Sequence, residues 1–548
     1  MWRNEYARAV PCDPSEEPGT RQVQGAAYSR VRPTPCAAPR LLAASARCAA
    51  LLGVRDARGE LLGRPEAAEW LSGNMVLEGS ETYAHCYGGH QFGTWAGQLG
   101  DGRAISLGQL EAPGLAGEGE GGGGEGVAPL LELQLKGAGK TPYSRRADGR
   151  AVLRSSLREF VGSEAMHALG VPTTRALSLA ATGQGVLRDQ FYDGNATLEP
   201  GAVVCRLAPS FVRFGSLELP AVRKDEHLMR AILDNTINAH FELPEGAERY
   251  GAFLDEVVAS TGALAARWQS VGFVHGVLNT DNCSVHGLTI DYGPFAFLEA
   301  FDPNFTPNSS DSTRRYAFGA QANIMAENCA RLAMALEPLL GPDLQANIAR
   351  ASEGFAASFY DAWQGELRRK LGLAEFDEER DDALSVGLFT LMARARADHT
   401  NTWRLLADVD SSMSPAEALE AIRPAFGAHG LEPVALESDG DDESQDPAAL
   451  LEDAGRLWMA QYLERLREDA MPDGERVAMM HAASPKYVPR NHLMQAAITA
   501  AENDDTGPLE RLMEVMLQPY DEQPDAEAQG FASPTPREQL RPGVVMLS

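Results

Sequence analysis

The stretch from residue 274 to 295, VHGVLNTDNCSVHGLTIDYGPF, holds the residues of this chain that are best suited to catalysis with a metal ion. It places Asp281 beside Asn282 and continues to Asp291, which opens an Asp-Tyr-Gly triplet. Magnesium prefers oxygen ligands and binds in proteins through one or two carboxylates plus the phosphates of a nucleotide. The types and order of these residues therefore predict a metal-binding catalytic loop.

A lysine and a glutamate upstream complete an order of residues that is typical of protein kinases. The segment LLELQLKG alternates leucines with polar residues, which predicts a half-buried strand with Lys136 on its polar face. Kinases carry a strand Lys, a helix Glu, a catalytic-loop Asn and an Asp-aromatic-Gly triplet in this order. We interpret Lys136 as the ammonium that neutralises phosphate oxygens, with Glu159 as its partner. Asn282 and Asp291 are then the magnesium ligands.

One position departs from the kinase pattern, which reads H-R-D-L-x-x-x-N in the catalytic loop. Aligning His275 with the kinase His places Val277 where the catalytic Asp should be, while Asn282 falls at the expected Asn. Valine cannot accept a proton. Asp281 is the nearby acid that could replace it as a base or orient a hydroxyl, so the pattern disfavours ordinary phosphoryl transfer.

The charge of the chain restricts its ligands. A formal net charge of -29 and a pI near 4.8 exclude a general nucleic-acid binder, because such proteins neutralise phosphates with a basic surface. A site for a triphosphate must therefore be a local basic island, to which Arg145, Arg146 and Arg150 could add. The crowded glycines of residues 87–107 indicate turns or a backbone that approaches a ligand closely.

The cysteines point to a reducing compartment. The chain has seven, scattered without C-x-x-C spacing, which is typical of an intracellular protein and not of a disulfide framework. Cys283 and His286 could bind a metal, but two isolated ligands do not make a site. We expect no membrane span, because no run of about 18 apolar residues exists, and no targeting signal is evident at the N-terminus.

Local patterns predict several elements. Residues 41–54 form an Ala-rich helical pattern ended by Gly53, and residues 151–169 repeat apolar side chains at helical spacing around Glu159. Residues 201–207 are strand-like, whereas helical spacing dominates residues 226–272.

These elements predict an α+β fold with two lobes, like that of a protein kinase. Residues 1–215 form a strand-rich N-lobe, and residues 216–520 form a mainly helical C-lobe. The Gly/Glu-rich segment 111–127 is predicted to be a flexible surface insertion, and 436–447 an acidic loop. We expect residues 521–548 to be a loose tail, and the cleft between the lobes to hold the site.

Four motifs resemble the selenoprotein O family of pseudokinases, also called SelO or YdiU. They are YGGHQFGTWAGQLGDGR, LQLKGAGKTPYSRRADGRAVLRSSLREF, HGVLNTDN with TIDYGPF, and SPKYVPRNHL, and the resemblance spans nearly the whole chain. It implies a kinase-like two-lobed fold that binds ATP in a flipped orientation. It also implies transfer of AMP, not phosphate, to Ser, Thr or Tyr hydroxyls of proteins.

The resemblance also implies a set of site residues. Gly100, Gly102 and Arg103 would form the nucleotide loop, Lys136 and Glu159 an ion pair, Asp148, Gly149, Arg206 and Arg213 the support of the outer phosphates, Asp281 the base, and Asn282 and Asp291 the metal ligands. ATP is then the substrate with Mg²⁺ or Mn²⁺, the partners are proteins, and we expect a monomer. The family is mitochondrial in eukaryotes and intracellular in bacteria.

We predict a magnesium-dependent protein adenylyltransferase that releases pyrophosphate. Two alternatives stay open. The protein could be an atypical kinase that transfers the γ-phosphate with Asp281 as its base, or an inert ATP-binding scaffold.

Overall fold

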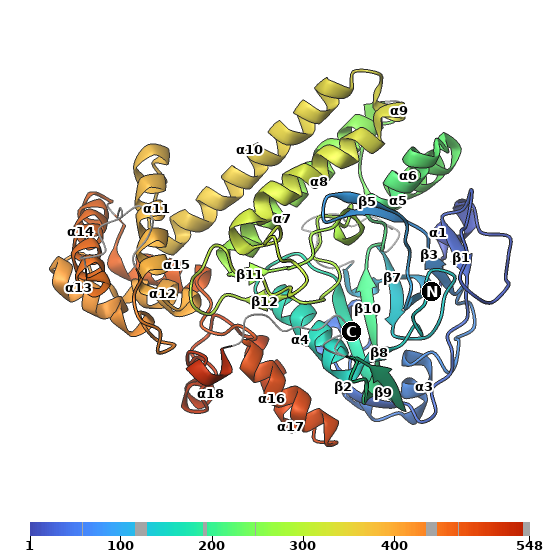
Figure 1. The fold of residues 1–548 in the computed structure, drawn as a ribbon, viewed down its shortest axis with the longest axis horizontal. Coiled ribbons are helices and arrows are strands. Elements are labelled where there is room, and N and C mark those ends of the chain that lie inside the picture. The colour runs from blue at the N-terminus through green and yellow to red at the C-terminus, as the bar shows by residue number, and fades with distance from the viewer. Residues whose placement is uncertain are drawn as a thin grey trace.

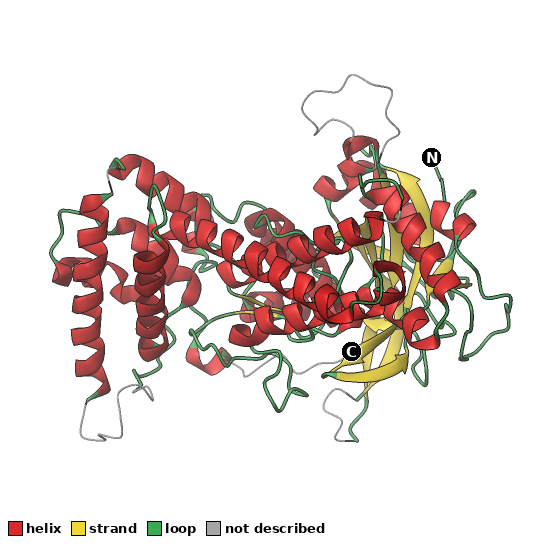
Figure 2. Ribbon diagram, turned by 90° about the horizontal axis from the view of Figure 1, so that it is seen from above, coloured by secondary structure: helices red, strands yellow, loops and turns green. Residues whose placement is uncertain are grey.

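The computed structural model describes residues 1–56, 58–115, 129–189, 194–246, 248–434, 446–469 and 471–540. Most strands belong to the first part of the chain and most helices to the rest, and Figure 2 shows the strands gathered toward one end of the molecule with helices making up the other. This separation is the α+β class that the sequence predicts.

The first part is built on an eight-stranded antiparallel sheet in the order β1-β3-β6-β7-β10-β9-β2, with β8 paired to β10 (Figure 1). The strands are β1 Tyr28–Arg30, β2 Arg40–Ala44, β3 Tyr83–His85, β6 Ala104–Glu111, β7 Leu130–Lys136, β8 Ala151–Val152, β9 Arg175–Arg188 and β10 Thr197–Ala208. In this register Lys136 lies opposite Ala104 on one side and Val204 on the other, and Gln134 lies opposite Arg206. The middle of the sheet therefore brings Lys136 and Arg206 onto neighbouring strands.

The predicted exposure of the lysine strand is wrong. All seven residues of β7 are buried, and not only the leucine face. The leucines pack in a core with Ile105 and Val203, while the opposite face, with Glu132 and Gln134, is covered by a buried polar network. Leucine and polar side chains do alternate between the two faces of β7, as predicted, but the polar face points into the protein and not to solvent.

The predicted helix 41–54 is also wrong in its first turn. Residues Arg40–Ala44 form strand β2, which pairs with β9, and helix α2 spans only Ala46–Leu51. Ser45 separates the two because its side chain accepts a hydrogen bond from the backbone N–H of Cys48, as an N-cap does. Pairing along β9 outweighs the helix propensity of the preceding residues.

The remaining helices flank the sheet or follow it in the chain. They are α1 Glu5–Ala9, α3 Pro65–Leu71, α4 Leu153–Ala168, α5 Phe214–Arg223, α6 Glu226–His240, α7 Glu248–Ser270, α8 Gln321–Ala335, α9 Glu337–Leu340, α10 Leu344–Leu371, α11 Glu378–Ala395, α12 His399–Leu405, α13 Pro415–Ile422, α14 Pro447–Glu468, α15 Asp473–Ala483, α16 Asn491–Glu502, α17 Gly507–Met516 and α18 Pro524–Ala528. The helices predicted in 151–169 and 226–272 are confirmed as α4, α6 and α7, and the strand in 201–207 as part of β10.

The long helices α7, α8 and α10 pack together across the middle of the molecule, and α11, α13 and α14 form the end remote from the sheet (Figure 1). The chain then returns to the part that contains the sheet, where α16 and α17 pack against α4. Two short hairpins matter for the site: β4 Gly88–Gln91 with β5 Thr94–Gln98, and β11 Phe273–Val274 with β12 Ala296–Phe297. None of the described helices is long and apolar enough to cross a membrane.

Three predicted loose segments have different outcomes. The tail is packed as far as Thr535, since Ala526 is fully buried and the Thr535 hydroxyl donates to Glu299 at 2.7 Å. This corrects the expectation of a loose tail for that part. Most of 111–127 and of 436–447, and residues 541–548, lie outside the described residues.

Candidate active site

The structure brings Lys136, Glu159, Arg206 and Asp291 into one cluster. Lys136 Nζ lies 2.7 Å from Glu159 Oε2 and also contacts Asp291 directly. Arg206 Nη1 lies 2.9 Å from Glu159 Oε1 and 3.6 Å from Asp291 Oδ1. The four residues come from β7, α4, β10 and the loop after β11, so distant parts of the chain converge here. Two cations and two carboxylates balance in charge within this cluster.

A second arginine ties the cluster to the catalytic loop. Arg213 Nη1 donates to the backbone carbonyl of Asp281 at 2.8 Å, and its guanidinium lies 4.6 Å above the Tyr87 ring. Its Nη2 is 3.4 Å from Asp101 Oδ1. Arg213 is 4% exposed, so these contacts hold its position firmly.

Asp101 connects the two arginines. Besides Arg213 it accepts a hydrogen bond from Gln134 Nε2 at 3.0 Å, and Gln134 in turn accepts one from Arg206. The Tyr87 hydroxyl donates to Asp101 at 3.2 Å. A buried carboxylate that satisfies several donors at once orients each of them, so Asp101 fixes the spacing of the two arginines.

The glycines around Asp101 serve protein packing. Gly100 has φ 129°, and a Cβ there would lie 2.5 Å from Cγ of Tyr143; a Cβ at Gly102 would lie 3.0 Å from the Tyr143 carbonyl. The predicted nucleotide loop is therefore a tight turn against Tyr143. Arg103, which follows it, is close enough to Asp291 for its charge to lower the pKa of that carboxyl.

Asp291 is a buried carboxylate among cationic side chains. Burial raises its pKa, but the charges of Lys136, Arg206 and Arg213 outweigh this and hold the pKa well below its usual value. It therefore stays ionised at neutral pH. Asn282 donates from Nδ2 to the carbonyl of Val277 at 3.1 Å, which orients its amide. A carboxylate and an amide oxygen suit Mg²⁺.

Asp281 has the surroundings of a general base. Burial raises its pKa to about 6, even though the charge of Arg213 lowers it. Oδ2 accepts a hydrogen bond from Gln91 Nε2 at 3.1 Å, whereas Oδ1 is buried and makes no hydrogen bond in the described part of the chain. A carboxylate with a pKa near the working pH and one uncommitted oxygen can accept a proton.

The hairpin β4–β5 covers this loop. The backbone N–H of His90 donates to Thr280 Oγ1 at 2.8 Å, and a Cβ on Gly89 would lie 2.7 Å from Asp281 Oδ1. His90 Nδ1 lies 2.6 Å from Glu218 on α5. Glycine is therefore required where the hairpin backbone passes over the Asp281 carboxylate.

Comparison with known proteins identifies the family. The family model described as "Protein adenylyltransferase SelO" matches residues 17–517. The chain belongs to the SelO family. A relative from Azoarcus sp., named "Protein nucleotidyltransferase YdiU", is 48% identical over 534 residues, covering 96% of this chain and 95% of the relative. Relatives of the same name from Nitrosospira multiformis and Rhodopirellula baltica are 46% and 44% identical, covering 96% and 100% of this chain and 92% and 98% of their own. The predicted membership of a nucleotidyltransferase family is confirmed.

Some predicted residues take other partners in this SelO-family chain. Asp148 pairs with Arg188, with Oδ2 2.7 Å from Nη1, and no contact between described residues joins it to Lys136. Gly149 has φ 73°, and a Cβ there would collide with the Gly139 carbonyl at 2.2 Å, so it holds a turn.

The arginines proposed as additions to the basic island also differ from one another. Arg150 donates to the carbonyls of Thr34 and Pro35, whereas Arg145 and Arg146 are exposed. Arg150 is therefore tied to the neighbouring loop.

Cys283 and His286 do not form a metal site. Cys283 Sγ donates to the carbonyl of Asn279 at 3.3 Å, while His286 Nε2 pairs with the Ser210 hydroxyl at 2.7 Å. Their side chains therefore have separate partners. All seven cysteines are free.

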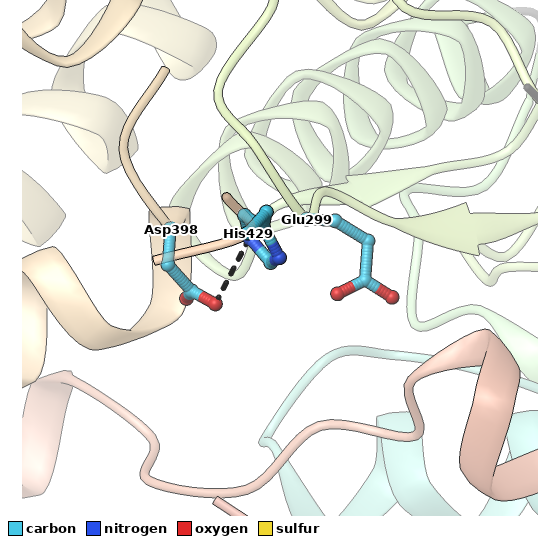
Figure 3. Close-up of side chains that lie close together, drawn as sticks. All are labelled: Glu299, Asp398 and His429. Carbon is cyan, nitrogen blue, oxygen red and sulfur yellow. Dashed lines mark ion pairs between the residues drawn. The ribbon is translucent and has the colours of Figure 1, made fainter. Parts of the chain in front are cut away.

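A different group of possible metal ligands lies elsewhere. Glu299, Asp398 and His429 place ligand atoms within 4.8 Å of one another, and Figure 3 shows His429 facing Asp398. However, Arg490 Nη1 lies 2.8 Å from Glu299 and 2.9 Å from Asp398, so a guanidinium already neutralises both carboxylates. His429 Nδ1 donates to the Thr535 carbonyl at 3.0 Å. We interpret these five residues as a structural clasp that joins distant helical segments.

A large cavity lies away from this site. A cavity of about 950 Å³ lies between strands β2, β9 and β10 and residues 501–504, and none of the predicted site residues lines it. The chemistry is thus better located by the converging charges than by cavity size.

Sequence reasoning missed Gln91, Asp101 and Gln134 as site residues. All three lie in segments already marked as unusual, since Gln91 and Asp101 fall among the crowded glycines and Gln134 on the polar face of β7. Their roles depend on contacts with residues far away in sequence, which no local pattern reveals.

Proposed function

We propose that the protein transfers AMP from ATP to Ser, Thr or Tyr hydroxyls of other proteins, with Mg²⁺ and with release of pyrophosphate. The observation that carries this proposal is the pairing of a valine at the usual base position with a buried, partly uncommitted Asp281 beside the Lys136 cluster. The family description and the names of the relatives support the same reaction class. The sheet part and the helical part then correspond to the two lobes of a kinase-like fold.

The proposed chemistry follows from charge placement. The acceptor oxygen attacks the α-phosphorus, its proton passes to Asp281, and the bond to the β-phosphate oxygen breaks so that pyrophosphate leaves. Lys136, Arg206 and Arg213 lie where they can neutralise phosphate oxygens. Because Glu159 and Asp101 hold these cations in place, the cations need not move as negative charge develops on the phosphate oxygens in the transition state.

The metal contributes neutralisation of phosphate charge and alignment of the triphosphate when it is bound. Asp291 and Asn282 are the residues that would hold it. Because Lys136 contacts Asp291 directly, the carboxylate is shared between a protein cation and the metal site. This sharing keeps Asp291 ionised before ATP arrives.

Labelled ATP separates this reaction from its alternatives. The protein is incubated with Mg²⁺, a desalted bacterial extract as the source of acceptors, and ATP labelled at either the α or the γ phosphorus. AMP transfer predicts that acid-precipitable label enters protein only from the α position. Label from γ alone would indicate an atypical kinase, and ATP-dependent stabilisation without any label would indicate an inert scaffold.

A further inference from the structure

The tip of hairpin β4–β5 presents an aromatic side chain in a strained conformation. Phe92 has φ 49° and is 45% exposed. A positive φ is unfavourable for a bulky residue and persists only where the surroundings enforce it, often at functional sites. Here the Phe92 N–H donates to the Tyr316 hydroxyl at 2.8 Å, and that hydroxyl donates to Asn279 at 2.6 Å. The catalytic loop itself thus holds the tip in place.

Two arginines lie against the same tip. Arg331 Nη2 donates to the Gly93 carbonyl at 3.4 Å, and Cζ of Arg315 lies 3.5 Å from where a Gly93 Cβ would be. Both arginines pair with Glu327, each at 2.6 Å. Arg314, the preceding residue, is exposed and has no carboxylate partner among the described residues.

The exposed charge at this tip is positive, against the overall charge of the chain. Of the nearby carboxylates, Glu327 is shared by two arginines, and Asp311 is buried and accepts backbone N–H groups of Arg315 and Tyr316. A positive patch on a chain of net charge -29 attracts acidic groups selectively.

The tip is also directly connected to the base. Gln91, next to Phe92, donates to Asp281 Oδ2, and Gly89 passes over Oδ1. A segment that packs on Phe92 therefore lies beside the carboxylate that we assign as the proton acceptor.

We propose that this tip, formed by Phe92 with Arg314, Arg315 and Arg331, is the docking surface for the acceptor protein. It selects an extended segment in which the hydroxyl residue has an apolar neighbour and flanking Asp or Glu residues. The apolar neighbour packs on the Phe92 ring, and the acidic residues pair with Arg314 and its neighbours. The assignment of this segment as the AMP acceptor rests on the proposed function.

Peptide binding tests this surface without relying on catalysis. Two fluorescein-labelled probes are Glu-Glu-Leu-Thr-Leu-Glu-Glu and Lys-Lys-Leu-Thr-Leu-Lys-Lys, and their binding to the full chain is followed by fluorescence anisotropy. The acidic probe should bind about tenfold tighter than the basic one at low salt, and the difference should shrink at high salt because exposed charges are screened.

Three variants assign the contacts. Arg314→Glu should weaken the acidic probe about fivefold or more, whereas Arg47→Glu, an equal charge change at an exposed site on α2, should not. Phe92→Asn should weaken both probes about tenfold, the scale of a buried aromatic contact. Asn tolerates a positive φ, so this variant should keep the melting temperature of the wild type.

Equal affinity for the two probes, no measurable binding of either, or unchanged binding by Phe92→Asn would overturn the proposal. So would an equal loss in Arg47→Glu. A failure of AMP transfer from labelled ATP would leave these binding results intact, so the docking surface and the proposed reaction can fail independently.

Discussion

Replacing Arg490 by Leu should open the helical part of the protein locally. Arg490 is 1% exposed and its guanidinium pairs with Glu299 Oε2 at 2.8 Å and with Asp398 Oδ2 at 2.9 Å. Burial raises the pKa of Asp398, but the charge of Arg490 together with hydrogen bonds from His429, Arg490 and the Asn401 N–H outweighs burial and holds the pKa well below its usual value. The substitution thus removes the cation that lies between the two buried carboxylates and leaves His429 facing Asp398.

The size of the stability loss follows from the buried carboxylates that remain without their arginine. Breaking a buried ion pair by removing one partner costs about 3–5 kcal/mol, because the remaining charge stays buried and uncompensated. A matched control is Arg423→Leu, since Arg423 is 40% exposed and pairs with Glu420 and Glu452 at the surface. Exposed pairs of this kind contribute about 0–1 kcal/mol.

Hydrogen exchange measured by mass spectrometry resolves this difference locally. A loss of about 3 kcal/mol corresponds to roughly a hundredfold loss of protection, at 1.4 kcal/mol per factor of ten. We expect that loss in peptides covering α12 and α16, the helices that begin next to Asp398 and Arg490. If Arg490→Leu accelerates exchange there no more than Arg423→Leu does, the clasp does not stabilise these helices.

Further predictions concern the proposed base Asp281, the proposed metal ligand Asp291 and a buried lysine. Gly89→Ala places a methyl group 2.7 Å from Asp281 Oδ1, so AMP transfer should fall at least about tenfold, while the ATP-induced rise in melting temperature stays. Asp291→Ala should instead abolish that rise in the presence of Mg²⁺, measured by differential scanning fluorimetry. Lys370 is 1% exposed over Trp403, and burial lowers its pKa to about 7 from the usual lysine value of 10.5. The unfolded chain therefore binds more protons between these two values, so the free energy of unfolding should rise with pH across this window. Urea titrations should show that Lys370→Met removes this slope.

The residues that converge at the site could be found from the sequence because each carries a local signal. A strict alternation placed Lys136 on the polar face of a strand, helical spacing placed Glu159, and the Asp-Tyr-Gly triplet marked Asp291. The structure brings all three into contact. Their order along the chain was informative because it matches the order in which a kinase-like fold uses them.

What the sequence could not show depends on long-range packing. Strand β7, predicted to be half-buried, is buried on both faces because Glu132 pairs with His85 and Gln134 with Asp101, partners on other strands and turns. The sequence marked Arg490 as part of the SPKYVPRNHL motif but gave no signal for its partners, since Glu299, Asp398 and Arg490 are widely separated and meet only through the tertiary fold. For the same reason Asp148 was not expected to pair with Arg188.

The prediction of a helix over 41–54, where the structure has a strand and a short helix, is wrong for a related reason. Alanines and leucines favour a helix in isolation, but residues 40–44 pair with β9 as a strand. Ser45 then caps the N-terminus of helix α2. Sheet pairing is a tertiary interaction, and its strength is not contained in the segment itself.

The most direct test of the account is mass spectrometry of the proteins modified by the wild type and by Asp281→Asn. Equal amounts of each enzyme act on the same extract with ATP and Mg²⁺, and tryptic peptides are searched for added groups. We expect adenylyl groups on Ser, Thr or Tyr with the wild type, and their loss with Asp281→Asn at an unchanged ATP-induced shift in melting temperature. Phosphoryl groups in place of adenylyl groups, or undiminished adenylylation by Asp281→Asn, would contradict it.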